Sequence, residues 1–157
     1  MALKPEINLA QKKIINGLYV ISTKLGNKVN AMTAAWVSRV SFKPPLVMVA
    51  VGKTRFSHHM IKESGVFAIN VLGPDNIDMV KHFGFKSGAT TDKFAGIDYN
   101  TKVTGAPILT DCIAWLDCKV SGCHDAGDHT LFVGEILDGG IVREGETMVY
   151  KREEIFG

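Results

Sequence analysis

CIAWLDCKVSGCHDAGDHTLFVGEILDGGIV, residues 112–142, contains two long strand-like runs on either side of one polar segment. The runs cover residues 112–123 and 130–142. Residues 124–128 between them read HDAGD, and Asp and Gly are residue types that favour turns. The pattern predicts a long β-hairpin.

Further strands are predicted on the N-terminal side of this hairpin. Residues 14–23 and 28–41 are strand-like, and Gly26-Asn27 between them suits a tight turn. Residues 46–51 read LVMVAV without a polar break, which predicts a strand covered on both faces at the centre of a sheet. Residues 66–72 predict another strand, and residues 148–151 a last short one.

Two short helices and one long loop lie between the predicted strands. Residues 54–63 have helical spacing of apolar residues, with Thr54 as the expected N-cap and Gly65 as the residue after the helix. A second helix is predicted after Pro74, where apolar residues recur at helical spacing. Residues 84–99 show no regular pattern, and an ordered loop of this length is typical of a functional segment.

The number of strands and their hairpin spacing favour a closed antiparallel barrel with a few short helices over a parallel sheet. The chain has 157 residues and no internal repeat or linker, so we expect one domain over residues 1–157.

Composition excludes several classes of protein. Apolar residues make up 46% of the chain and charged residues 22%, with a net charge of +2, which argues against a nucleic-acid surface. The N-terminal residues lack a signal-peptide core, and no apolar run is long enough to span a bilayer, so we expect a cytoplasmic protein outside the membrane. Cys112, Cys118 and Cys123 are expected to be reduced thiols.

Common catalytic motifs are absent from the sequence. It contains no GxGxxG or GxxxxGK[ST], so a nucleotide cofactor would need another kind of binding site. It also lacks GxSxG and HExxH, which removes the simplest hydrolase and zinc-protease hypotheses. Cys118, Cys123, His124 and His129 lack a paired CxxC spacing, so no metal site is expected. His58 and His59 are adjacent on a predicted helix, so they cannot face the same ligand.

Three segments could bind a ligand. In the first, Lys53, Thr54, Arg55 and Ser57 lie at a predicted helix N-terminus, where free N–H groups favour a phosphate; the alternative is a threonine cap with two solvated cations.

The second segment, residues 29–36, interrupts a strand with small and polar residues, which would let a flat ligand approach the backbone; the alternative is a tight bend of a barrel. In the third, His129 follows Asp128 at the mouth of a strand and could contact a nicotinamide; the alternative is an ordinary turn.

Taken together, these segments resemble the flavin reductase-like family of FMN-binding split barrels, which includes the flavoredoxins. The most specific block is residues 127–135, GDHTLFVGE. The other similar blocks, in family order, are residues 17–20, 30–34, 40–47, 63–72, 83–84, 87–88 and 92–94.

The resemblance implies a mainly β fold, an antiparallel split β-barrel of Greek-key type, and a homodimer with FMN in a groove near the subunit interface. It also implies roles for individual residues. Asn30, Ala31, Met32 and Thr33 would bond the isoalloxazine edge and ribityl chain, and Lys53, Thr54, Arg55 and Ser57 would hold the phosphate. Ser38, Ser87 and Lys93 are further candidates for cofactor binding. His129 would lie where a nicotinamide stacks on the flavin.

The implied activity is that of an FMN-dependent oxidoreductase. NADH or NADPH would give a hydride to flavin N5, and electrons would pass to free flavin, ferric complexes or a rubredoxin- or ferredoxin-like partner protein. One alternative is a flavoredoxin-like electron carrier that binds FMN tightly and reacts little with NAD(P)H. A second alternative is a non-redox ligand-binding or sensor barrel.

Overall fold

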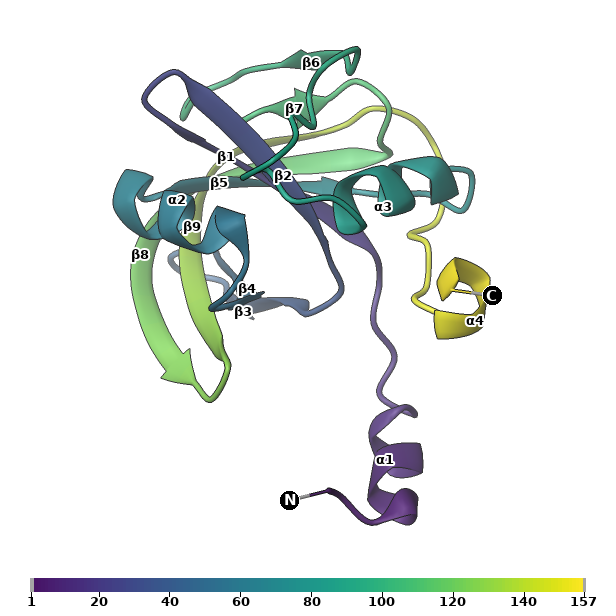
Figure 1. Cartoon of the computed structure of the whole chain (residues 1–157). Coiled ribbons are helices and arrows are strands. Elements are labelled where there is room, and N and C mark those ends of the chain that lie inside the picture. The colour runs from purple at the N-terminus through teal and green to yellow at the C-terminus, as the bar shows by residue number, and fades with distance from the viewer. Residues whose placement is uncertain (1, 157) are drawn as a thin grey trace.

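Seven strands form one antiparallel sheet in a computed structural model that describes residues 2–156 (Figure 1). The strand order is β2-β1-β5-β8-β9-β4-β3. Their bounds are Tyr19–Leu25 (β1), Lys28–Ala34 (β2), Val37–Ser41 (β3), Leu46–Gly52 (β4), Val66–Val71 (β5), Ala114–Ala126 (β8) and His129–Ile141 (β9). A separate two-stranded pair consists of β6 (Tyr99–Asn100) and β7 (Ile108–Leu109).

The long hairpin is confirmed as β8 and β9, each of 13 residues. Its turn is shorter than residues 124–128, because the strand pairing extends to Ala126 and His129 and leaves only Gly127 and Asp128 unpaired. Gly127 has a φ of 65°, a conformation that glycine adopts without steric cost. The register shifts twice along the hairpin, and such irregularities increase the twist that lets a long hairpin curl.

The sheet curls into a barrel whose two edge strands are β2 and β3. β2 also approaches β4, and the chain passes from β2 to β3 through Ala35 and Trp36. The backbone N–H of Ala50 on β4 donates to the Trp36 carbonyl oxygen at 3.0 Å. The predicted antiparallel barrel is therefore confirmed, with its split between the two edge strands.

The strand at residues 46–51 is confirmed as β4, but its predicted central place is wrong. β8 is the middle strand of the sheet, and β4 lies next to the edge strand β3. Val47, Val49 and Val51 are buried in the core. Its apolar character arises from the curl of the sheet, which covers a strand that lies close to the edge.

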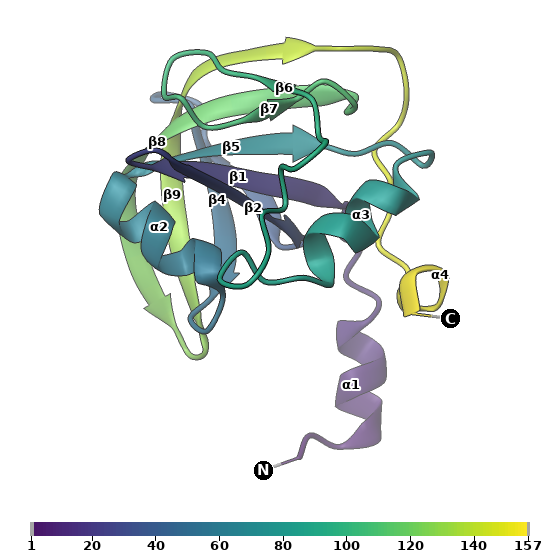
Figure 2. The ribbon, with the colours of Figure 1, turned by 45° about the horizontal axis from the view of Figure 1, so that its top comes forward.

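Four helices accompany the sheet: α1 (Pro5–Gln11), α2 (Phe56–Ser64), α3 (Ile77–Gly84) and α4 (Arg152–Phe156). α2 and α3 lie along the barrel near β1 and β2, whereas α1 projects from the barrel (Figures 1 and 2). None of the α1 residues is buried. No helix within residues 2–156 is long and apolar enough to cross a membrane.

Two apolar clusters hold the elements together. Inside the curled sheet, Phe67 and Phe132 pack with Ile61 of α2. Gly134 is needed there, because a Cβ at this position would lie 2.6 Å from the Phe67 ring. The second cluster packs Val80 and Phe83 of α3 against β1, β2 and the loop that follows α3.

Several element boundaries differ from the sequence predictions. The N-cap of α2 is Arg55 and not Thr54, and Arg55 makes no side-chain capping bond. Gly65 ends the helix in the left-handed conformation, as predicted. Residues 28–41 form two strands rather than one, and residues 148–151 contribute only a single bridge, Gly17 to Val149. α1 and α4 were not predicted.

Candidate functional site

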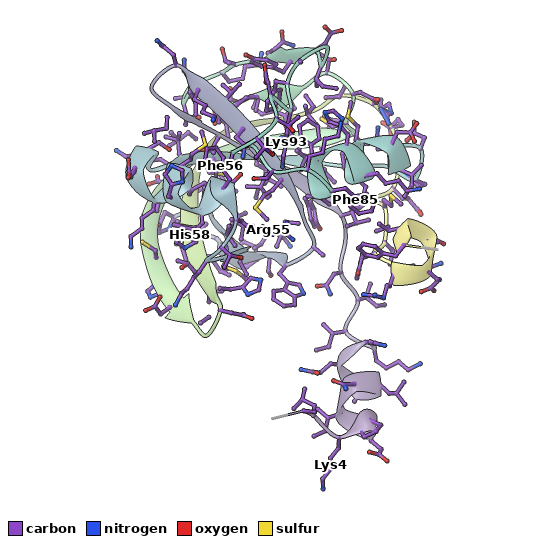
Figure 3. All side chains as sticks on the ribbon, viewed as in Figure 1. Lys4, Arg55, Phe56, His58, Phe85 and Lys93 are labelled. Carbon is purple, nitrogen blue, oxygen red and sulfur yellow. The ribbon has the colours of Figure 1, made fainter. Side chains whose placement is uncertain are left out.

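A groove runs along the N-terminus of α2, β2 and the loop after α3. It consists of three adjoining hollows of about 420, 190 and 220 Å³, and Arg55 lines all of them. We call the largest hollow the inner end. Its lining residues are Asn30, Met32, Thr54, Arg55, Phe56, Ser57, Gly84, Phe85, Lys86, Ser87, Gly88 and Lys93. Figure 3 labels Arg55, Phe56, Phe85 and Lys93 around this space.

The inner end is held by hydrogen bonds that buried side chains donate. The Asn30 amide donates to the Ser57 hydroxyl at 2.8 Å, which joins β2 to α2. The Lys93 ammonium donates to the carbonyl oxygens of Ala31, at 2.8 Å, and Phe83, at 3.0 Å. The loop therefore has its lysine fixed against β2 and the end of α3.

Lys93 keeps an unusual electrostatic state in this position. Burial, together with the nearby Arg55 guanidinium, lowers its pKa to about 8. An ammonium has three N–H donors, and the two carbonyl oxygens take two of them. One N–H therefore remains for a ligand in the hollow that Lys93 lines.

The start of α2 adds a second source of positive potential. The first N–H groups of a helix have no intrahelical partner, and the helix dipole favours an anion there. Arg55 precedes the first residue of this nine-residue helix. Its exposed guanidinium forms no ion pair with any carboxylate within residues 2–156. The inner end therefore suits a phosphate group.

At the other end of the groove, which we call the outer end, His129 lies beside Trp36. The ring centroids are 4.7 Å apart, and the Trp36 side chain is 54% exposed. His129 Nδ1 lies 2.6 Å from an Asp128 carboxylate oxygen, and this hydrogen bond lowers the pKa of Asp128. With Nδ1 engaged, Nε2 is the nitrogen of His129 that is left for a ligand. The outer end offers an aromatic wall and an oriented imidazole.

The middle of the groove is formed by β2. Met32 lines both the inner and the outer hollow. The Ala31 side chain is in the core, so this residue offers only backbone atoms to a ligand. Thr33 lines the two smaller hollows, and its hydroxyl donates to the Val80 carbonyl oxygen at 2.8 Å.

Two predicted residues point elsewhere. Ser38 lies on β3 and lines a separate hollow of about 510 Å³ with Phe42 and Leu46. The Lys53 ammonium forms an ion pair with Asp125 of the long hairpin at 3.0 Å. The structure thus gathers Asn30, Met32, Thr54, Arg55, Ser57, Ser87 and Lys93 at the inner end and does not bring Ser38 or the Lys53 ammonium to it.

The groove also contains residues to which the sequence predictions gave no individual role, although Trp36 belongs to the segment 29–36 that was predicted to approach a ligand. Phe56, Phe85 and Lys86 line the inner end. Trp36 and Tyr150 line the outer end, and no local pattern in the sequence marks Tyr150 as part of this site. The irregular loop over residues 84–99 was the one signal that pointed to Phe85 and Lys86.

The histidine pair has two separate environments. His58 Nε2 lies 2.7 Å from the Thr130 hydroxyl, and its ring contacts Phe132. The exposed His59 ring contacts Phe56. No group of three His, Cys, Asp or Glu side chains in residues 2–156 is arranged to hold a metal ion.

Comparisons with known proteins agree with the fold. The family model described as "Flavin reductase like domain" matches residues 12–157. The chain is also similar to a solved structure of the NADH:FAD oxidoreductase SgcE6 from Streptomyces globisporus C-1027, with a TM-score of 0.84 and 26% identity. That match covers 96% of this chain and 92% of the other.

Three named relatives match in sequence. The chain is 36% identical over 136 residues to the "High molecular weight rubredoxin" of Moorella thermoacetica, covering 85% of this chain and 59% of that protein. It is 33% identical over 140 residues to the "Ferric-chelate reductase (NAD(P)H)" of Archaeoglobus fulgidus, covering 88% and 83%. The chain also spans only 27% of the "Diflavin flavoprotein A 1" of Synechocystis sp..

Proposed function

This chain belongs to the flavin reductase-like family, and on that premise we propose that it is an oxidoreductase that transfers a hydride from NADH or NADPH to FMN. Electrons then pass to free flavin, a ferric complex or a partner protein. The observation that carries the proposal is the groove itself, with a cationic inner end and an aromatic outer end joined along β2.

The residues of the groove fit FMN. The phosphate would meet Lys93, Arg55 and Ser57 at the inner end, with Thr54 and Ser87 beside them. The ribityl chain would pass Asn30 and Met32, and the ring would lie along the backbone of Ala31 and Thr33. When bound, FMN supplies a hydride acceptor and a store for two electrons.

The outer end would orient the nicotinamide. Asp128 holds the His129 imidazole with Nε2 available for the carboxamide, and Trp36 bounds the same hollow. Holding two rings at reacting distance is a large part of what such a protein contributes, because the reaction chemistry resides in the cofactors. His129 is the residue we propose to contact the hydride donor.

Ser38 and Lys53 are retained in the proposal with smaller roles. The Lys53–Asp125 ion pair is exposed, and exposed pairs contribute little to stability. The role proposed for Lys53 therefore requires its ammonium to leave Asp125 for a ligand phosphate. Ser38 lines a separate hollow, so a role for it requires a ligand that reaches β3. Its hydroxyl donates to the Arg39 carbonyl oxygen at 3.1 Å.

A second candidate function is a flavoredoxin-like electron carrier with tightly bound FMN. The names of two relatives favour it, the "High molecular weight rubredoxin" and the "Diflavin flavoprotein A 1", of which this chain spans 59% and 27%. A rubredoxin- or ferredoxin-like partner would then exchange electrons with this chain.

We also propose a homodimer. Leu3, Ile7 and Ile14 are exposed on and beside α1, which packs none of its side chains into the barrel. Light scattering after size-exclusion chromatography would measure the mass.

The single domain over residues 1–157 and the cytoplasmic location stay predictions.

The first experiment is an anaerobic titration of the FMN-loaded protein with NADH and with NADPH. We expect the absorbance band of oxidised flavin to disappear within seconds with at least one donor. A flavin that stays oxidised with both donors, and is reduced only by a protein donor, would favour the electron carrier. Protein that takes up no flavin would favour a non-redox binding barrel.

A further inference from the structure

We propose that α4 is a movable wall of the groove, and that Phe156 on this helix controls how fast a flavin enters and leaves. The inference rests on the proposed function, because it assumes that the groove holds a flavin. α4 lies beside α3 at the end of the C-terminal segment (Figures 1 and 2). Ile155 and Phe156 of this helix line the hollow of about 190 Å³, which we call the middle hollow.

The middle hollow shares lining residues with both ends of the groove. Phe85 also lines the inner end, Tyr150 also lines the outer end, and Arg55 lines all three hollows. A flavin with its phosphate at the inner end and its ring along β2 would therefore pass in front of α4. The middle hollow is smaller than the roughly 300–1,000 Å³ of typical small-molecule sites. We therefore expect one of its walls to move when a ring enters.

α4 is the least firmly attached wall of the middle hollow. Only Ile155 of its five residues is buried, and it packs in the apolar cluster of α3. Among residues 2–156, no backbone hydrogen bond or ion pair joins α4 to the barrel. β2, by contrast, pairs with β1 along all of its seven residues. Because segments with few buried contacts open locally at low cost, α4 can move while the barrel stays folded.

The chain just before α4 is firmly attached, which places a hinge at Lys151. The backbone N–H groups of Met148 and Tyr150 donate to carbonyl oxygens outside the C-terminal segment, at 2.7 and 2.8 Å. Lys151 lies between Tyr150 and the first residue of α4. Its ammonium pairs at 3.6 Å with Glu154 of α4 itself, so this ion pair does not tie the helix to the barrel.

One aromatic contact holds α4 against the other side of the groove. The Phe156 ring centroid lies 5.5 Å from that of Phe85, which directly follows α3. Aromatic rings attract each other at this distance. Both rings are more than half exposed, so they can separate without opening the core. Ile155 thus anchors the wall, and Phe156 holds it closed.

The first test uses a property that separates a movable wall from an ordinary binding contact. A wall that must open affects entry and exit alike, whereas loss of a contact acts mainly on exit. Phe156→Ala weakens the closed position, so both rate constants for FMN should rise about fivefold. The equilibrium affinity should change less than about twofold. Stopped-flow fluorescence at several FMN concentrations gives both constants, from the slope and the intercept of the observed rate.

Phe42→Ala is the matched control for this variant. Phe42 is also exposed and also contacts an arginine, with the Arg39 guanidinium 5.8 Å from its ring centroid. The corresponding distance from Arg152 to Phe156 is 5.0 Å. Phe42 lines the separate hollow on β3 and none of the three hollows of the groove, so its removal should change neither rate.

Limited digestion with trypsin reports the movement without a binding rate. Trypsin cleaves after lysine and arginine, and Lys151 and Arg152 lie at the hinge. Saturating FMN should slow cleavage there at least threefold, because a wall that has closed on the ring opens less often. Cleavage after Lys12 and Lys13, which follow the projecting α1, should not respond to FMN and serves as the internal control.

A second variant removes the anchor of the wall. Ile155→Ala should raise both rate constants more than Phe156→Ala does, and thermal unfolding checks that the barrel remains folded. Unchanged rates in both variants, or faster exit with unchanged entry, would overturn the movable wall and leave the proposed function standing. Cleavage at the hinge that ignores FMN would overturn the wall as well. Wild-type protein that binds no FMN would instead overturn the proposed function.

Discussion

The two ends of the groove differ in how far they are organised before a ligand arrives. At the inner end, Asn30, Ser57 and Lys93 are buried. Their hydrogen bonds already join β2 to α2 and the loop after α3 to β2. At the outer end, Trp36 is exposed and His129 is held by an exposed carboxylate. Preorganised groups bind with less loss of conformational freedom. The inner end is therefore built for retention of a ligand and the outer end for exchange of one.

The largest expected effect comes from removing the cation of the inner end. Lys93→Met should weaken FMN binding about 100-fold, because a buried charged donor contributes about 1.5–3 kcal/mol per hydrogen bond. Binding is measured by fluorescence titration of the apoprotein. The reduction rate of the flavin that does bind should stay within about twofold of the wild type.

Thermal unfolding controls for the fold of this variant, because the Ala31 and Phe83 carbonyl oxygens lose their donor. Lys93→Arg keeps the charge and should recover part of the affinity. Lys119→Met provides the matched removal of an exposed cation. A folded Lys93→Met protein with wild-type affinity would remove Lys93 from the phosphate site.

At the outer end we expect a smaller effect, which changes the rate of flavin reduction and not the affinity for flavin. His129→Ala should slow flavin reduction by the nicotinamide about tenfold, a loss of roughly 1.4 kcal/mol in transition-state stabilisation, and leave FMN affinity within about twofold. Stopped-flow absorbance under anaerobic conditions measures the rate. His124→Ala changes an exposed histidine of the same hairpin and serves as the control. Wild-type reduction kinetics in His129→Ala would show that the imidazole has only a structural role.

The smallest effect is a pH dependence confined to the inner end. Burial lowers the pKa of Lys93 to about 8, so its proton is bound at pH 7 and largely lost at pH 9.5. A phosphate monoester has a second pKa of about 6 and stays dianionic over this range. FMN affinity should therefore fall as pH rises, by about fivefold between pH 7 and 9.5.

Because the dianion favours the protonated lysine, the midpoint in the complex should lie above that of the free protein. Lys93→Met should bind FMN with a flat profile over the same range. A wild-type profile that is also flat, or that rises with pH, would show that Lys93 does not meet the phosphate.

The local parts of the fold were predictable from sequence, and the non-local parts were not. Residues 112–142 form the expected hairpin because two long strand-like runs flank a turn with glycine at the position that needs positive φ. The place of β4 depends on which strands pair across the barrel, and its own apolar run contains no such information. α1 was missed because it buries nothing in the barrel, so its sequence lacks the apolar face of a core helix.

The candidate site shows the same division. Arg55 and Ser57 were found from one segment, because a helix start beside cations has a local signature. Lys93 was expected only through the family resemblance, which the match over residues 12–157 confirms. Trp36 and Tyr150 come together only when the sheet curls and the C-terminal segment returns to it. Ser38 has a hydroxyl group like Ser57 and Ser87 of the inner end, but its position on β3 places it at another hollow.

The C-terminal helix α4 lies at the groove, so a domain joined after this helix would start close to the groove. Ile155 and Phe156 line one of its hollows, and the Phe156 ring lies 5.5 Å from that of Phe85 at the inner end. A second redox domain linked directly after α4 would start beside the cofactor. A short flexible linker keeps such a domain at a millimolar effective concentration. Electron transfer to it would then be independent of protein concentration.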